Sequence, residues 1–478
     1  MHSLEMGTSP SDSIVSTADD VRWRELRDCK HSLSETACHK FKARDQTWQE
    51  MKKIGGTGVR FMVVGDVGRR GVPDKTTAHA DALRVRDAGA KVCGETCAAA
   101  IFLGDNVYNT GINEYEDTLF LQRLTEEYLS AHKGFVPELY MSQGNHDWGP
   151  GVPQRDRAQR LHQDISQRLG DHVHGAAHFW HAQFGPLRVA SLDSNYLVRR
   201  CKETNTGTSK QPSAWSDRGV ACPDEKSPTL YEGLFNVVGR AGANNTVVVA
   251  HHPWYGNGRH GTAAYYRDPY MGLDNYTVGR GGPWRVALEN VVRPRAALFL
   301  SGHDHNVQVH HSKKHPGTLS VIVGSGSKVS PPGRNTAVGK KYHQQDMVLE
   351  AHCRLGFAVV EHQQGKLSVQ IYSLNGSNTP SCNQKITKTR GAYEPHLGKA
   401  PTSASPALHD LRCRRFEFTE KKWTSTDSCE DFSRTLSADP RKNTSNPAQD
   451  APPESQGKPP VTPQADASVS KGPSLHGM

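Results

Sequence analysis

The sequence predicts an α/β fold built from two β-sheets. From Gly58 onward, short β-rich runs alternate with helical segments, a pattern typical of βαβ units around a largely parallel sheet. The later runs, from Val307 onward, have the pattern of antiparallel strands, which indicates a second sheet packed on the first. A chain of 478 residues is long enough to bury the interior of such a domain.

These patterns give the expected elements in chain order. The strands expected in the first sheet are 59–64, 98–103, 139–142, 187–192, 246–250 and 297–300. The strands expected in the second sheet are 307–311, 319–323, 356–361 and 367–373. Helices are expected at 76–88, 114–132, 154–169 and 283–292, where polar and apolar residues alternate as surface helices require.

Composition divides the chain into four parts. Residues 1–57 are charged and lack a strong apolar period, so we expect an N-terminal extension before a core domain at 58–375. A C-terminal extension is expected at 376–432. Residues 433–478 are rich in Pro, Ser, Gln, Lys and Asp, with almost no large apolar residue. Such a segment cannot offset its ordering entropy by burial, so it is predicted to be a disordered tail.

The overall charge does not indicate a nucleic-acid partner. The formal net charge is +9 and the pI is near 9.0, but Lys and Arg are scattered along the chain. No apolar run reaches the length of a membrane span, and the first residues lack the hydrophobic core of a signal peptide. These features predict a soluble chain without an export signal.

Cysteine usage leaves the redox compartment open. The ten cysteines are too sparse for a disulfide-built scaffold, and no CxxC pair suggests a zinc site. Cys93 and Cys97 are expected to be structural. The stretch 199–227 has the composition of a long surface loop, which a bond between Cys201 and Cys222 could tie.

Five short blocks carry the side chains that point to chemistry. Each follows a predicted strand: Gly65-Asp66-Val67-Gly68, Gly104-Asp105-Asn106-Val107-Tyr108, Gly144-Asn145-His146-Asp147, His251-His252-Pro253 and Gly302-His303-Asp304-His305. The carboxyl ends of strands are where open α/β sheets place ligands, and a glycine lets the chain turn sharply there. One such Asp is usually a helix cap, and one such His is usually a surface residue. Five blocks in order are hard to explain in either way.

This order of blocks resembles the calcineurin-like metallophosphoesterases over residues 58–373. The resemblance implies a four-layer α/β/β/α metallophosphoesterase sandwich of two mixed sheets flanked by helices. Many members carry a histidine two residues after the first Asp, but Gly68 stands there in this chain. Tyr108, three residues after Asp105, resembles the pattern of the purple acid phosphatases, of the small, single-domain, tartrate-resistant acid phosphatase-like type.

The purple acid phosphatase resemblance implies a dinuclear metal centre with seven protein ligands. Asp66, Tyr108 and His305 would bind Fe(III), Asp105 would bridge the two ions, and Asn145, His251 and His303 would bind the second ion. A phenolate oxygen is a hard ligand that favours a trivalent ion. Neutral amide and imidazole ligands suit a divalent ion, either Fe(II), Zn or Mn.

The implied activity is that of an acid phosphatase, a hydrolase that cleaves phosphate monoesters by attack of a metal-bound hydroxide. By the same resemblance, His146 would donate a proton to the leaving oxygen, and His260 would face the substrate. Asp147 either orients His146 or caps the following turn. His252 is expected to be a neighbour of the site and not a ligand.

Two other functions stay open at this stage. One is a catalytically inactive phosphatase-like scaffold or anchoring protein, although such proteins typically lose a ligand and all seven remain here. The other is a different metallophosphoesterase, such as a phosphodiesterase, which normally keeps the histidine absent at Gly68. Purple acid phosphatases are generally secreted, lysosomal or vacuolar, which contrasts with the missing export signal.

Overall fold

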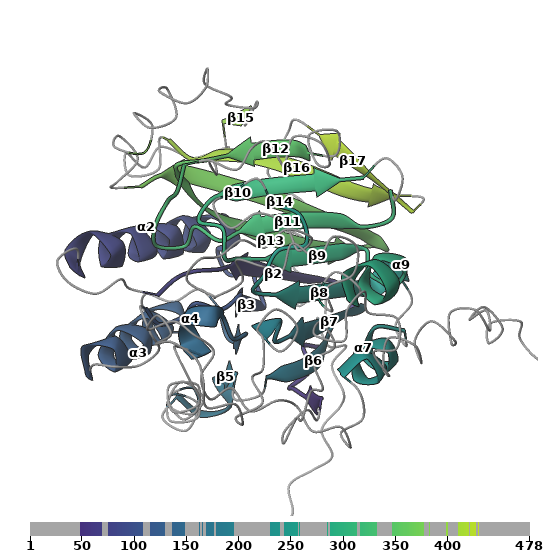
Figure 1. The fold of residues 1–478 in the computed structure, drawn as a ribbon, viewed down its shortest axis with the longest axis horizontal. Helices are drawn as coiled ribbons and strands as arrows, with labels where there is room; N and C mark the ends of the chain where they lie inside the picture. The colour runs from purple at the N-terminus through teal and green to yellow at the C-terminus, as the bar shows by residue number, and fades with distance from the viewer. Residues whose placement is uncertain are drawn as a thin grey trace, which may run out of the picture. The chain divides into compact units, whose positions relative to one another are not determined.

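Figure 1 shows the fold in a computed structural model of the chain. The structure describes residues 48–68, 75–108, 115–129, 136–148, 162, 165, 169–175, 178–195, 230–239, 243–256, 258, 284, 287–312, 316–331, 347–376, 382, 398–399, 410–419, 421–426 and 429. All of them belong to the compact unit Met1–Glu430. The predictions for the first 47 residues, for 199–227 and for the tail lie outside the described residues, as does nearly all of the helix expected at 154–169.

One sheet, called sheet B, combines parallel strands near one edge with antiparallel strands near the other. Its order is β15-β16-β14-β13-β2-β3-β4-β5, and β17 pairs with β16. The parallel strands are β2 (Val59–Val64), β3 (Ala99–Phe102), β4 (Leu139–Met141) and β5 (Val173–His174). The antiparallel strands are β13 (Arg354–Gln363), β14 (Lys366–Asn375), β15 (Gly398–Lys399), β16 (Arg412–Thr419) and β17 (Lys422–Thr426).

The second sheet, called sheet A, is also mixed. Its order is β1-β6-β7-β8-β9-β11-β10-β12. Its strands are β1 (Gln49–Glu50), β6 (Phe179–Phe184), β7 (Leu187–Leu192), β8 (Thr246–Ala250), β9 (Leu298–Ser301), β10 (Val307–His311), β11 (Leu319–Val323) and β12 (Met347–Ala351). Strands β7, β8, β9 and β11 run parallel to one another, so their carboxyl ends lie at one edge.

Helices cover the outer faces of both sheets, with the strands between them (Figure 1). Sheet B carries α2 (Lys75–Cys93) and α3 (Tyr115–Leu129), and sheet A carries α7 (Leu230–Gly239), a π-helical turn η5 (Leu288–Val292) and α9 (Arg293–Arg295). The short helical segments are α4 (Asn145–Trp148), η2 (Gly170–His172) and η3 (Ala243–Asn245). The four-layer α/β/β/α arrangement of two mixed sheets is confirmed.

The layers follow from the alternation of side chains along buried strands. In β2, Val63 faces the core between the sheets, whereas Val64 faces the helices on the outer side of sheet B. In β8, Val249 faces the inner core and Val248 faces the helices that cover sheet A. Both faces of these strands are covered, which explains why their sequences are largely apolar.

One expectation about the sheets was wrong. The six strands predicted for the first sheet are divided between the two sheets, because β2, β3 and β4 lie in sheet B while β7, β8 and β9 lie in sheet A. The later antiparallel strands are divided as well, with β10 and β11 in sheet A and β13 and β14 in sheet B. A fully buried apolar strand fits either sheet equally well, so its sequence pattern does not reveal which strands it pairs with.

Three disulfides join cysteines within the described residues. They are Cys93–Cys97, Cys353–Cys382 and Cys413–Cys429. The first closes the end of α2, and the third joins β16 to residue 429. No helix among the described residues is both long enough and apolar enough to span a membrane.

Candidate metal centre

The five blocks meet where the carboxyl ends of the two sheets come together. In sheet B, β2, β3 and β4 are parallel, so the chain leaves them at Gly65, Gly104 and Gly144 on the same edge. In sheet A, β8 and β9 are parallel, and the histidine-bearing blocks follow them. The amide of Gly65 donates to the carbonyl of Val323 in β11 at 2.8 Å, which joins the two edges.

Three of the predicted ligands have a strained backbone. Asp66, Asp105 and His303 have φ angles of 59°, 53° and 69°, in the left-handed region that side chains with a Cβ disfavour. Each such residue costs on the order of 1–3 kcal/mol, and this kind of strain is concentrated at functional sites. The packing is also close, because a Cβ added at Gly144 would lie 2.2 Å from the amide nitrogen of Asp105. These sharp turns direct three side chains into one space.

The first group of predicted ligands consists of Asp66, Tyr108 and His305. Tyr108 Oη donates a hydrogen bond to Asp66 Oδ1 at 2.7 Å and lies 3.3 Å from His305 Nε2. His305 Nε2 also lies 3.3 Å from Asp66 Oδ1. Ligand atoms that share one cation at bond lengths of about 2 Å have separations of this size.

The ring of Tyr108 lies against the backbone at Gly68. A Cβ added at Gly68 would lie 2.7 Å from Tyr108 Cδ2 and 2.7 Å from the carbonyl oxygen of Asp105. A side chain at position 68 and the ring of Tyr108 therefore compete for the same space. This is the arrangement expected if a phenol takes the place of a histidine at that position.

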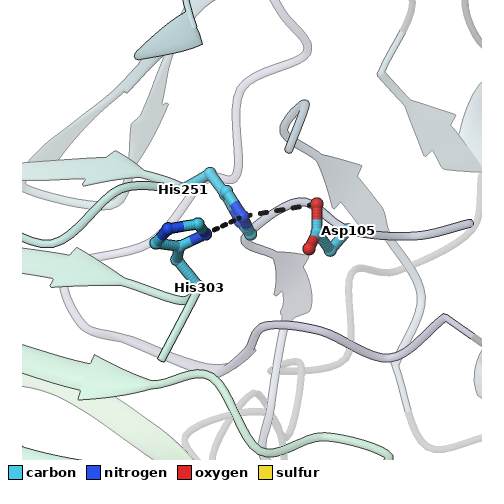
Figure 2. Close-up of side chains that lie close together, drawn as sticks. All are labelled: Asp105, His251 and His303. Carbon is cyan, nitrogen blue, oxygen red and sulfur yellow. Dashed lines mark hydrogen bonds and ion pairs between the residues drawn. The ribbon is translucent and has the colours of Figure 1, made fainter. Parts of the chain in front are cut away.

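The second group surrounds the Nε2 atom of His251. This atom lies 2.9 Å from Asn145 Oδ1, 3.3 Å from Asp105 Oδ1 and 3.2 Å from His303 Nδ1. Figure 2 shows His251 between Asp105 and His303, whose ligand atoms all lie within 4.8 Å of one another, so these three residues could hold a metal ion. His251 Nδ1 lies 3.0 Å from the carbonyl of Leu103, and a hydrogen bond there orients Nε2 toward the group.

The two groups concentrate acidic side chains in a buried space. Burial raises the pKa of Asp66 to about 7, and the charge of Asp105 adds to this rise. Burial also acts to raise the pKa of Asp105, but the positive charges of His251 and His146 outweigh it and hold that pKa well below its usual value. Burial, together with both carboxylates, raises the pKa of Tyr108 well above its usual value. A multivalent cation would compensate these buried anions, so the donor set fits metal ions.

His146 lies at the open side of these groups. Its Nε2 is 3.9 Å from Asp105 Oδ2, and its ring centroid is 4.4 Å from that of Tyr108. Its amide donates to Asp105 Oδ1 at 2.8 Å. The side chain remains partly exposed, so it can exchange protons with solvent.

Asp147 ties two loops of the site together. Its buried carboxylate accepts hydrogen bonds from the amides of Gly144 at 2.7 Å, Asn106 at 2.9 Å and Val107 at 3.0 Å. These bonds assign the carboxylate to the backbone around Asn106 and Gly144, and none of the three amides belongs to the turn after Asp147 that it was expected to cap. They do not support the interpretation in which Asp147 orients His146.

Two further predicted positions have different outcomes. His260 lies outside the described residues, so its predicted contact with substrate stays a prediction. His252 Nδ1 lies 2.7 Å from Ser194 Oγ, and the same oxygen accepts a hydrogen bond from the His252 amide at 3.1 Å. His252 is therefore held by Ser194 beside the predicted ligand His251.

The sequence analysis missed a sixth block, residues 324–330, which follows β11. Ser327 Oγ donates to the carbonyl of Asp66 at 2.8 Å, and Ser330 Oγ lies 3.3 Å from His305 Nδ1. The signal was present as a glycine directly after an apolar strand, as in the first two blocks. It was overlooked because Gly, Ser and Lys are not common metal ligands.

The sequence analysis also missed Asp193, which follows β7. Its Oδ2 accepts a hydrogen bond from Trp148 Nε1 at 2.9 Å and lies 2.7 Å from His178 Nδ1. Asp193 therefore fixes the end of α4, the helical turn that carries Asn145.

The fold and the converging donor groups define a protein of the metallophosphoesterase class. The family model described as calcineurin-like phosphoesterase matches residues 59–307, which is more than half of the chain. The chain belongs to this family. No curated protein matches it.

The chain also matches solved structures, at low similarity. The chain matches GAP50, described as the anchor in the inner membrane complex of Plasmodium, with 16% identity and a TM-score of 0.42, covering 73% of this chain and 100% of that chain. It matches Vps29 of Chaetomium thermophilum with 10% identity and a TM-score of 0.26, covering 66% and 92%. It matches Vps29 of Cryptosporidium parvum with 10% identity and a TM-score of 0.26, covering 67% of this chain and 93% of that chain. At these values the matches carry no argument about function.

Proposed function

We propose that this protein is a phosphatase of the purple acid phosphatase type, which hydrolyses phosphate monoesters with Fe(III) and a divalent metal ion. The observation that carries the proposal is the position of Tyr108. Its hydroxyl lies 2.7 Å from Asp66 and 3.3 Å from His305. Its ring lies against Gly68, where many relatives carry a histidine.

The donor chemistry supports two different ions. Asp66, Tyr108 and His305 would hold Fe(III), because carboxylate and phenolate oxygens are hard anionic ligands. The second group would hold the divalent ion mainly through neutral atoms, and Asp105 would contribute to both ions. When bound, such a pair supplies Lewis-acid charge that polarises the phosphoryl group and lowers the pKa of water.

The formal charge of the centre supports the substrate class. Two aspartates and one phenolate bring three negative charges, whereas a trivalent and a divalent ion bring five positive charges. The surplus would favour a phosphate dianion over a neutral substrate.

His146 is the proposed proton donor. It follows Asn145, which places it next to the proposed divalent site, and its imidazole is partly exposed. A protonated Nε2 at this position could transfer its proton to the leaving oxygen and be reprotonated from solvent.

The test combines metal analysis, a visible spectrum and turnover of p-nitrophenyl phosphate on the purified protein. We expect iron and an absorption band from tyrosinate bound to iron. Tyr108→Phe should abolish the band and lower turnover at least about 100-fold, the size of loss found when one group that stabilises transition-state charge is removed. Tyr128→Phe removes the hydroxyl of a buried tyrosine on α3, so this matched control should keep the band.

Other outcomes would contradict the proposal. A colourless protein with zinc or manganese in both positions would favour another metallophosphoesterase, such as a phosphodiesterase. A protein that binds no metal would favour a non-catalytic scaffold or anchoring role.

A further inference from the structure

A lysine ammonium stands beside the proposed phenolate ligand. Lys328 Nζ lies 3.2 Å from the centroid of the Tyr108 ring, well within the distance at which a ring face attracts a cation. Tyr108 is almost completely buried, whereas Lys328 is partly exposed. The ammonium therefore lies at the boundary between the buried donor groups and solvent.

The backbone that carries Lys328 is fixed to the first ligand block. The amide of Gly326 donates to the carbonyl of Gly65 at 2.9 Å. Ser327 Oγ donates to the carbonyls of Asp66 at 2.8 Å and Gly68 at 2.7 Å. These bonds fix the residues immediately before Lys328, so less conformational entropy is lost when the side chain binds a ligand.

The same segment is also tied to the last ligand block. The amide of Ser330 donates to the carbonyl of His305 at 2.7 Å. Strand β11, which leads into the segment, is parallel to β9, so the segment leaves sheet A at the same edge as the histidine-bearing block. Lys328 is therefore held between two of the loops that carry proposed ligands.

We propose that Lys328 is a substrate-binding residue that selects phosphate dianions. This inference rests on the proposed function, because it assigns the ammonium to an oxygen of the phosphoryl group bound at the metal pair. An ammonium next to two cations is repelled by them, and an anion bound in common relieves this repulsion. Because the Coulomb energy scales with the charge of the ligand, Lys328 favours monoesters, which are dianions, over diesters, which are monoanions.

The test measures anion binding and not turnover. Isothermal titration of the full-length, metal-loaded protein at about pH 8 compares inorganic phosphate, mainly a dianion there, with dimethyl phosphate, a monoanion. Lys328→Met, which keeps the unbranched stem of the side chain and removes its charge, should weaken phosphate binding ~10-fold and dimethyl phosphate binding only ~3-fold.

Two variants serve as controls. Lys328→Arg keeps the charge and should stay within about twofold of the wild type for both ligands. Lys422→Met removes the same charge from an exposed position on β17 and should change neither affinity. The metal content of each variant is measured, and affinities are compared per dinuclear site.

The outcomes separate this inference from the proposed function. Equal phosphate affinity in Lys328→Met and the wild type would overturn the role of Lys328 and leave the phosphatase proposal intact. An increase in metal affinity in Lys328→Met with unchanged phosphate affinity would also overturn it, because Lys328 would then compete with the first metal ion. A metal-loaded wild type that binds no phosphate would overturn both proposals.

Discussion

The carboxylate of Asp147 accepts a hydrogen bond from the amide of Asn106 at 2.9 Å, across 41 positions of the chain. The same carboxylate accepts a hydrogen bond from the amide of Gly144 at 2.7 Å. One buried side chain thus fixes the loop that carries Asp105 to the helical turn that carries Asn145. The spacing between these two proposed ligands depends on this link.

Asp147→Asn is expected to weaken binding of the second metal ion. The side-chain amide nitrogen of asparagine would face one of the backbone amides that donate hydrogen bonds to Asp147. Loss of a hydrogen bond that orients the metal ligands typically lowers metal affinity about 10–100-fold. Metal retained after dialysis against a graded chelator series measures the effect. Asp87→Asn, on the exposed face of α2, is the matched control. Wild-type metal retention in Asp147→Asn would contradict the proposed link.

The sequence predicted most of the central strands because each is a buried apolar run that ends at a turn. Strands β2, β7, β8, β10 and β11 have the predicted bounds. Strand β16 was missed because Arg and Glu alternate with its apolar residues. Assignment of each strand to a sheet depends on contacts distant in sequence, which no local pattern contains.

The convergence of the proposed ligands could be predicted because Asp, Asn and His residues, most of them next to a glycine, follow successive strands. The residues that hold those positions could not be predicted. Asp193, Ser327 and Lys328 have ordinary roles in most proteins, and only their distances to the site reveal what they do here.

Gly68→Ala is expected to destabilise the protein and lower its iron content. The added Cβ would lie 2.7 Å from both the ring of Tyr108 and the carbonyl of Asp105, so the ring or the backbone must move. Overpacking of this kind costs about 1–3 kcal/mol. Thermal unfolding and iron analysis measure the two effects.

Gly239→Ala is the matched control for this substitution. A Cβ at Gly239 has no atom within 4 Å, so the melting temperature should stay constant or rise slightly. If Gly68→Ala retained wild-type stability and iron, Tyr108 would not be confined by position 68.

The protein is expected to lose stability in acid through His162, which is fully buried. Burial lowers the pKa of His162 from 6.5 to about 4. The unfolded chain therefore binds more protons below about pH 6.5, so stability is full above that pH and is lost as the pH falls toward 4. Between pH 7 and 5 the loss is about 2 kcal/mol.

Urea unfolding at these two pH values tests the sign and the size of this effect. His162→Gln should show a smaller difference between the two pH values than the wild type, because glutamine does not titrate. His172→Gln, at an exposed position in η2, should keep the wild-type difference. An unchanged pH dependence in His162→Gln would show that other groups cause the acid sensitivity.

Two of the described disulfides should differ in their effects on stability and on the metal centre. Cys353 and Cys382 are 29 positions apart, whereas Cys93 and Cys97 are only 4 apart. A disulfide that closes a longer loop restricts the unfolded chain more. Replacing Cys353 and Cys382 with serine should therefore cost roughly 3–4 kcal/mol, and replacing Cys93 and Cys97 roughly 2 kcal/mol. Calorimetric melting of both double variants measures the difference.

Of these two pairs, only Cys353 and Cys382 should affect iron binding. The amide of Cys353 donates to the carbonyl of Ser330 at 3.1 Å, and Ser330 in turn contacts His305. The double variant Cys353→Ser with Cys382→Ser should therefore retain less iron than the wild type, at a temperature where the variant and the wild type are both folded. The double variant Cys93→Ser with Cys97→Ser should retain the wild-type amount. Equal iron content in the two double variants would mean that the turn between β12 and β13 does not support His305.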